Sequence, residues 1–252
     1  MDELDKLCAT IVERCSQRAD LQRAEIRLTL QLKAICRRFV KGDVPDSVRL
    51  YSSLQGKSDH PYRTTALAVT QVLLNAREDI RQGRLLIEAQ LEQDVRALPI
   101  WPRVKATHGL GFLGVALLIG ATGDLRRYSN HSKVWKRLGL AVIDGRCQRK
   151  VPGPEGVRQG FSPNRRSTMW NLGSNMLRTQ SGLPTGRRYK AREPGPFRLG
   201  YDARKAYELA NGLPKAHAHN RAKRYMEKKL VRNIWRAWRE AGPALAPALA
   251  PA

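Results

Sequence analysis

The sequence predicts an all-α protein in which a long antiparallel coiled-coil hairpin precedes a compact, basic helical domain. Three observations support this fold class: two long runs in which apolar residues recur every three to four positions, prolines at 99 and 102, and a change of net charge at the same point. We therefore expect domains over residues 1–100 and 101–241. The low-complexity segment 242–252, rich in Ala, Pro and Leu, is expected to be disordered.

The two periodic runs cover residues 4–39 and 64–98. Residues 41–63 concentrate Gly, Pro, Asp and Ser, which favour turns, so we expect a loop there with at most a short helical turn. Two long helices joined by one loop predict an antiparallel coiled coil. We expect this hairpin to support homodimerisation or to act as a spacer.

Shorter helices are expected in the second domain. Residues 115–119 are the apolar centre of one helix, a second carries Val134, Trp135 and Leu138, and others span 166–178, 201–211 and 217–241. Residues 144–166 are rich in Gly, Pro, Arg and Lys, and the sequence leaves open whether they form a hairpin or a basic loop.

The charge is concentrated in the second domain. The chain has 46 Lys and Arg against 22 Asp and Glu; residues 1–100 hold 16 basic and 14 acidic residues, and residues 101–252 hold 30 and 8. Such self-repulsion is costly unless a polyanion neutralises it, and phosphate neutralisation dominates nucleic-acid binding. The sequence lacks a long apolar run, a signal peptide and a lipidation motif, which predicts a cytoplasmic protein that does not bind membranes.

Cys8, Cys15, Cys36 and Cys147 form no CxxC pair, which predicts reduced, packed thiols. The glycines of GLGFLG, residues 109–114, do not follow a hydrophobic strand, as a dinucleotide site would require. Two readings remain open for them: a turn whose free N–H groups accept a phosphate, or close helix packing.

The sequence does not predict a catalytic centre, a metal site or a cofactor. The eight acidic residues after position 100 are dispersed, and His217 and His219 have no third ligand at metal spacing. Ser162 and Ser167 lie beside arginines but have no evident general base, so a helix-capping role is favoured. We therefore expect a protein that is not an enzyme.

Basic residues of the second domain are the candidate RNA contacts, because Arg and Lys neutralise phosphates and Arg can bind them bidentately. In the last helix, Met226, Leu230, Ile234 and Trp238 are expected to pack, while the basic residues lie on another face. The candidate RNA-binding residues are Arg126, Arg127, Lys133, Lys136, Arg137, Arg146, Arg149, Lys150, Arg158, Arg165, Arg166, Arg178, Arg187, Arg188, Lys190, Arg221, Arg224, Lys228 and Arg232.

The segment from Thr107 to Arg178 resembles the C-terminal domain of bridge-RNA-guided insertion-sequence transposases. The shared pattern is a GxG turn, an apolar helix ending in GD, a helix ending in GL and a later helix ending in LR. Its positions here are Gly109, Gly111, Gly123, Asp124, Gly139, Leu140, Asn164, Leu177 and Arg178. Two departures stand out: the chain starts with the predicted coiled coil instead of a RuvC-like domain, and Asp144 precedes Gly145 where those transposases carry a nucleophilic serine.

The order of coiled coil and basic helical domain also resembles the Nop domain, which binds box C/D-type guide RNAs. Both features meet in the TIGR-associated (Tas) proteins of prokaryotes and their viruses, which the chain resembles. The resemblance implies a Nop-like second domain, a guide RNA, a target DNA read through that RNA, and no nuclease in this chain; cleavage would need a nuclease in trans. The alternatives are a truncated or domesticated transposase with residual serine chemistry, and an architectural RNA- or DNA-binding protein without a guide.

Overall fold

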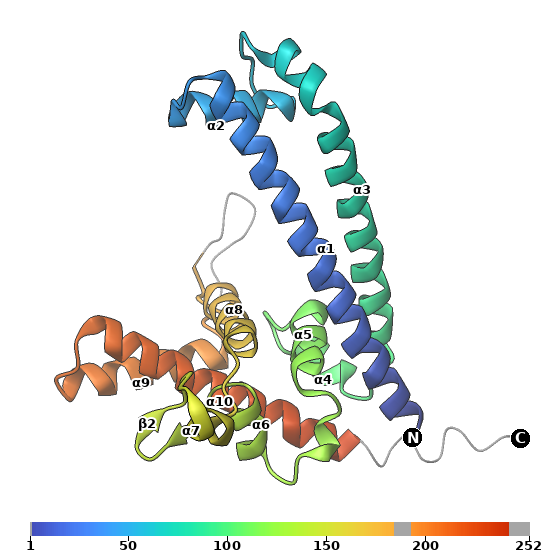
Figure 1. Cartoon of the computed structure of the whole chain (residues 1–252). Coiled ribbons are helices and arrows are strands. Elements are labelled where there is room, and N and C mark those ends of the chain that lie inside the picture. Colours follow the sequence, from blue (N-terminus) through green and yellow to red (C-terminus); the bar gives the residue numbers. More distant parts are fainter. Residues whose placement is uncertain (1, 184–192, 242–252) are drawn as a thin grey trace, which may run out of the picture. The chain divides into compact units, whose positions relative to one another are not determined.

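The computed structural model describes residues 2–183 and 193–241, and these residues are mostly helical (Figure 1). The prediction of an all-α protein is confirmed, with two short strands as the exception within the described chain. Residues 242–252, the tail that was predicted to be disordered, lie outside the described residues. Contacts divide the chain into two compact units, one formed by residues 14–90 and the other by residues 1–13 with 91–252.

The first unit is a pair of antiparallel helices closed by a short third helix. Helix α1 (Glu3–Phe39) contributes its larger part, α2 (Val44–Leu54) follows, and α3 (Arg63–Arg96) returns along α1. The antiparallel pairing is fixed by ion pairs of Arg18 with Glu88 at 2.8 Å and of Glu25 with Arg84 at 2.9 Å. The two long helices therefore run antiparallel, and the coiled coil stays a prediction.

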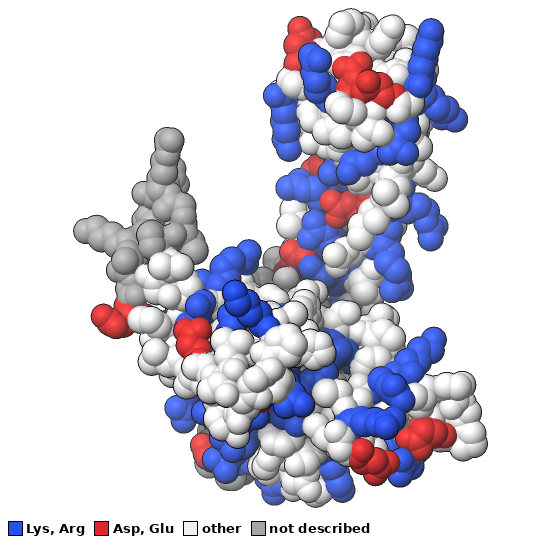
Figure 2. Space-filling model, turned by 90° about the vertical axis from the view of Figure 1, so that its left-hand side faces the viewer, with Lys and Arg blue, Asp and Glu red and all other residues white. Residues whose placement is uncertain are grey.

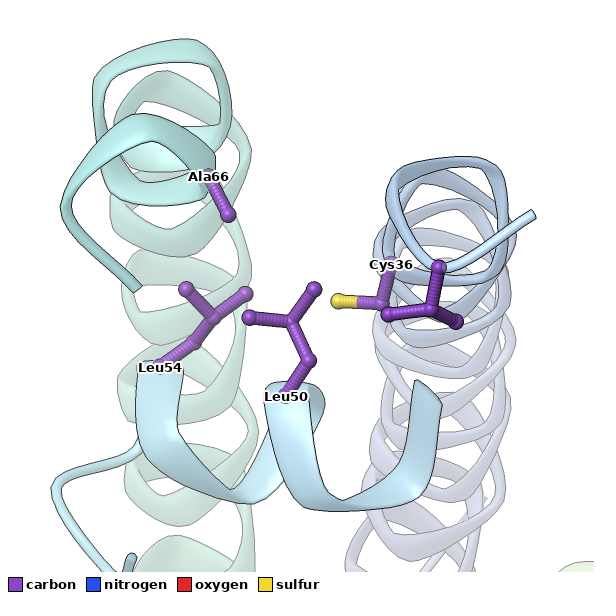
Figure 3. Close-up of a cluster of buried hydrophobic side chains, with 5 residues drawn as sticks. Cys36, Leu50, Leu54 and Ala66 are labelled. Carbon is purple, nitrogen blue, oxygen red and sulfur yellow. The ribbon is translucent and has the colours of Figure 1, made fainter. Parts of the chain in front are cut away.

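Helix α2 is a correction to the predicted loop over residues 41–63. Asp43 caps it by accepting a hydrogen bond from the Asp46 backbone N–H, and a proline lies in its first turn, where the missing N–H costs nothing. Leu50 and Leu54 point from α2 into the space between Cys36 of α1 and Ala66 of α3 (Figure 3). Burying this apolar face stabilises the helix at a place where turn-forming composition indicated none.

The middle of the hairpin has a thin core. No residue is buried between Cys15 and Leu32 of α1, or between Thr70 and Leu91 of α3. Within this stretch, over residues 16–31 and 71–90, four large apolar side chains are more than half exposed: Ile26, Leu30, Val72 and Leu86. Polar and ionic contacts therefore carry much of the pairing between the two helices in this stretch.

In the second unit, the short helix α4 (Trp101–Ala106) follows the end of α3. Pro102 occupies the first turn of α4, which is compatible with a helix start. Helix α5 (Phe112–Thr122), the 3-10 turn η1 (Leu125–Arg127) and α6 (His131–Arg137) follow, and they confirm the predicted apolar helix around residues 115–119 and the helix around Val134.

Residues 142–159 contain a hairpin and a helix. Strands β1 (Val142–Ile143) and β2 (Arg146–Cys147) pair antiparallel across the two-residue turn Asp144–Gly145, both of which have positive φ. Asp-Gly is the typical sequence of such a turn. Helix α7 (Gly153–Gln159) comes next, and it corrects the prediction of a hairpin or a basic loop over this stretch.

Three helices complete the unit: α8 (Pro163–Thr179), α9 (Pro196–Ala210) and α10 (Lys215–Ala241). Helix α10 packs against α9, α8, α6 and η1, and α5 packs against α8. The prediction for its apolar face is confirmed, since Met226, Leu230, Ile234 and Trp238 are all buried. The described part of the chain contains no helix that is long and apolar enough to cross a membrane.

Indole N–H groups tie α10 and α6 to the rest of the unit. Trp238 donates to the buried Asp124 carboxylate at 2.9 Å, and Trp235 donates to the Tyr128 carbonyl at 3.2 Å. From α6, Trp135 donates to the Lys228 carbonyl at 3.1 Å. Each polar atom is satisfied, so the register of α10 against α6 and η1 is specified as well as stabilised.

Candidate nucleic-acid interface

Charged side chains are buried where α8 packs against α10. Lys223 and Glu227 lie one turn apart on α10, with exposed fractions of 1% and 0%. Arg166 of α8 brings its Nη1 atom to 2.9 Å from Glu227 Oε2. Gly173 of α8 makes room for this carboxylate, because a Cβ atom there would lie 2.6 Å from Glu227 Oε1. The interface between the two helices is thus built around a buried ionic group.

Lys223 also fixes an aromatic side chain. Its ammonium group lies 3.2 Å from the centroid of the Trp170 ring and donates to the Ser174 hydroxyl. A desolvated cation against an indole face is attracted by the ring quadrupole, by about 2 kcal/mol or more. Trp170 nevertheless keeps 39% of its surface exposed. Its position is therefore fixed on the inside while part of the ring remains accessible.

Burial changes the proton affinity of this group. It raises the pKa of Glu227 to about 7, and the neighbouring cations Arg166, Lys223 and Arg224 oppose that rise. Burial also lowers the pKa of Lys223 to about 8, and the charge of Glu227 opposes that fall. The pKa of Arg166 is lowered by burial too. Even when ionised, a single carboxylate neutralises only one of the three cations around it.

A pocket of about 500 Å³ opens beside this group. It is lined by Arg166 and Trp170 of α8, by Arg221 and Arg224 of α10, and by Cys147, His217 and Asn220. The Nη1 atom of Arg224 is buried without a hydrogen-bond partner among the described residues. Arg221 contacts Glu208 at 3.3 Å, but its side chain is 63% exposed. The pocket therefore combines several guanidinium groups with an aromatic ring.

A second arrangement of cations and aromatic rings lies on α9 and α10. The Arg204 guanidinium is 4.9 Å from the Tyr207 ring centroid and 5.4 Å from that of Tyr225. Tyr207 is 58% exposed and Tyr225 37% exposed. On the face of the molecule shown in Figure 2, Lys and Arg side chains are spread over the C-terminal unit among fewer Asp and Glu. Such surfaces attract phosphates and offer rings to bases.

The predicted RNA-binding residues fall into several groups. Arg166, Arg221 and Arg224 meet at the pocket just described. Lys133, Lys136 and Arg158 line a second pocket of about 400 Å³, while Arg146 and Arg149 share a third, of about 410 Å³, with Arg158. Lys150 and Arg178 are exposed. Arg187, Arg188 and Lys190 lie outside the described residues.

Other predicted residues have contacts within the protein. Arg126 pairs with Asp2 and Asp124 at 2.7 Å, and Arg127 pairs with Asp5 at 3.1 Å. Arg137 and Arg165 donate to backbone carbonyls. Lys228 lies 5.0 Å from the Trp135 ring centroid, and Arg232 is half-buried. Arg126 in particular has a structural role, because its guanidinium joins α1 to η1 through three acidic residues.

Sequence reasoning missed the three residues at the centre of the site. Glu227 was counted among dispersed acids, and neither Lys223 nor Trp170 was singled out. One signal was present: Lys223 and Glu227 are four residues apart and therefore lie on the same face of α10. Lys223 meets Trp170 only because α8 packs on that face. That packing is a tertiary contact, which the sequence of α10 alone does not reveal.

Two of the three glycines of residues 109–114 serve close packing, whereas Gly111 has open space where a Cβ atom would lie. A Cβ atom on Gly109, which has φ +86°, would lie 2.1 Å from Thr179 Oγ1 of α8, and one on Gly114 would lie 2.9 Å from Leu172 Cδ1. Of the two readings left open, helix packing accounts for both positions. Ser162 caps α8 by accepting from the Arg165 N–H, as predicted.

The histidines and cysteines have individual environments. His219 Nδ1 lies 2.6 Å from the Tyr201 hydroxyl, and His217 lines the arginine pocket. Within residues 2–183 and 193–241, no three His, Cys, Asp or Glu side chains come together as a metal site would require. Cys8, Cys15 and Cys36 are buried, as predicted, but the expectation of a packed thiol is wrong for Cys147, which is exposed in the β2 strand.

A comparison of the chain with protein-family models, with curated proteins and with solved structures finds no match. The resemblance to transposase, Nop and Tas proteins stays a prediction from the sequence motifs.

Replacing Glu227 by Ala should lower the stability of the free protein by about 3 kcal/mol, because Arg166, Lys223 and Arg224 would be left without a buried counter-ion. Urea denaturation followed by circular dichroism measures this change. Glu240→Ala, at an exposed position near the end of α10, is the matched control and should change stability by less than about 0.5 kcal/mol. Equal stability of the two variants would contradict the structural role assigned to Glu227.

Proposed function

We propose that the C-terminal unit binds a structured guide RNA through phosphate contacts and that the chain acts as the RNA-binding component of an RNA-guided DNA-targeting system. The observation that carries this proposal is the cation group between α8 and α10, where Arg166, Lys223 and Arg224 surround a single carboxylate beside an open pocket. Phosphates bound there would supply the missing negative charge. The motif resemblance supports the guide and the DNA target.

The proposal assigns no reaction to this chain. Its function as an adaptor would be to hold the RNA, while base pairing between RNA and DNA reads the target sequence. Cleavage would come from a nuclease acting in trans. The alternative of residual serine chemistry receives no support from Ser162, whose hydroxyl is the N-cap of α8 and whose position is explained by that role.

The salt dependence of RNA binding should fall when two arginines of the pocket are removed. The Arg221→Ala/Arg224→Ala variant should bind RNA more weakly and lose about 1 from the log–log salt slope for each phosphate contact removed. Filter binding between about 50 and 200 mM salt measures the slope. Neither substitution removes an apolar core residue, and neither arginine carries the buried pair with Glu227.

The matched control removes two exposed arginines of α1, Arg27→Ala/Arg38→Ala. It changes the net charge by the same amount in the first unit. A control that weakened RNA binding as much as the pocket variant would mean that net charge, and not the pocket, determines affinity.

The guide is tested by sequencing the RNA that copurifies with the protein. A guide-binding protein should carry one dominant, repeat-derived species at near-stoichiometric amount. An architectural binder without a guide would instead carry a heterogeneous mixture of cellular RNA, and that result would overturn the guided function while leaving RNA binding intact.

We further propose that the helical hairpin pairs with a second copy of the chain and so forms a coiled-coil homodimer. The support is the thin core of residues 16–31 and 71–90 and the exposed apolar side chains Ile26, Leu30, Val72 and Leu86. Burial of such side chains on association is favourable, by about 25 cal/mol per Å².

Sedimentation equilibrium at increasing protein concentration tests this assembly. The wild type should be a dimer at micromolar concentration, and Leu30→Glu/Val72→Glu should be a monomer with unchanged helicity. A monomeric wild type over the whole range would contradict the proposal.

A further inference from the structure

The pocket between α8 and α10 has a composition that phosphate binding alone does not require. Arginines alone are sufficient to neutralise the phosphates of an RNA backbone. Here three arginines line the same pocket as a partly exposed indole, that of Trp170. Trp170 is a large apolar side chain at the wall of a pocket that is otherwise lined mainly by arginines and by other polar residues, among them His217 and Asn220. An aromatic ring in this setting indicates a ligand that has a flat ring as well as negative charge.

One face of Trp170 is covered from within the protein. The Lys223 ammonium lies 3.2 Å from the ring centroid, so a ligand could stack only on the opposite face. Lys223 is itself 1% exposed and hydrogen-bonded to Ser174, and the Trp170 ring lies nearly perpendicular to that of His219, with a centroid distance of 6.3 Å. The indole is thus held in place before a ligand arrives, which reduces the entropy lost on binding.

The size of the pocket limits what can stack there. At about 500 Å³ it is within the range of sites that enclose one small ligand, and it is bounded by β2 and by the start of α10. A base inside a duplex has both faces covered by its neighbours, so it cannot stack on a protein ring until it leaves the helix. Sequence-tolerant recognition of unstacked bases by aromatic side chains is a common mode of RNA binding.

We propose that this pocket binds one unpaired nucleotide of the RNA, with its base stacked on the accessible face of Trp170 and its phosphate contacted by Arg221 and Arg224. Arg166 is held by Glu227 and borders the pocket at a distance of 5.6 Å from the Trp170 ring centroid. This inference rests on the proposed RNA-binding function and adds to it the structural class of RNA: a duplex interrupted by an unpaired nucleotide, or a single strand.

Binding is measured with three RNA hairpins that differ at one position: fully paired, with a single bulged adenosine, and with an abasic residue at the bulge. The wild type should bind the bulged adenosine about tenfold more tightly than the abasic bulge. Trp170→Ala should remove that preference, and Trp170→Phe should retain part of it. Tyr207→Ala, which removes an exposed ring on α9, is the matched control and should keep the full preference.

Alkylation of Cys147 provides a second measurement that needs no variant. Cys147 is exposed and lines this pocket, whereas the other three cysteines are buried. The bulged RNA should slow its reaction with N-ethylmaleimide several-fold more than the abasic RNA does. A single-stranded RNA that protects as well identifies a strand as the source of the nucleotide, whereas equal protection by free AMP would overturn the assignment to RNA.

The outcomes separate the two proposals. Absence of salt-dependent binding to any of the RNAs would contradict the proposed function itself. Binding of all three hairpins with equal affinity, together with an unchanged alkylation rate of Cys147 in the presence of the bulged RNA, would leave RNA binding intact and overturn the nucleotide pocket alone.

Discussion

The packing of α8 on α10 around buried charges determines the geometry of the second unit. Arg166 forms an ion pair with Glu227 at 2.9 Å, Gly173 leaves space for the Glu227 carboxylate, and the Lys223 ammonium lies against the Trp170 ring. Buried charges require partners at short distance, so the two helices can approach in only one register. That register places the indole of Trp170 and the arginines of α10 around the same pocket.

The buried charges between α8 and α10 are incompletely neutralised. Arg166, Lys223 and Arg224 share one carboxylate, and burial acts against the charge of Lys223 and of Glu227 alike. An arrangement of this kind is costly in the free protein. Under the proposed function, an anion that enters the pocket would lower this cost, so the stability of the unit and its affinity for phosphate would be linked.

Much of the fold could be predicted from local patterns, and the exceptions have identifiable causes. The long helices and the buried face of α10 follow from apolar periodicity. Helix α2 was missed although Asp43 and Pro45 are a typical helix start, because turn-forming composition was weighted above the capping signal. For residues 144–166 a hairpin and a basic loop were both left open, although Asp144–Gly145 is a typical hairpin turn sequence that favours the first.

The candidate site was only partly predictable for a different reason. Arg166, Arg221 and Arg224 were identified by charge alone, but charge also selected Arg126, which is held by Asp2 and Asp124 within the protein. Whether a cation is free depends on tertiary contacts. Lys223 and Trp170 could not be identified from residue type, because lysine is usually exposed and tryptophan usually buried, and here the lysine is buried and the tryptophan partly exposed.

Ultraviolet crosslinking of the RNA complex, followed by mass spectrometry of the peptides, tests the central claim most directly. Crosslinked nucleotides should map to the peptides that contain Trp170, Cys147 and residues 217–224, which line one pocket. Crosslinks confined to α1–α3, with none at these peptides, would contradict the assignment of the RNA to the α8–α10 interface.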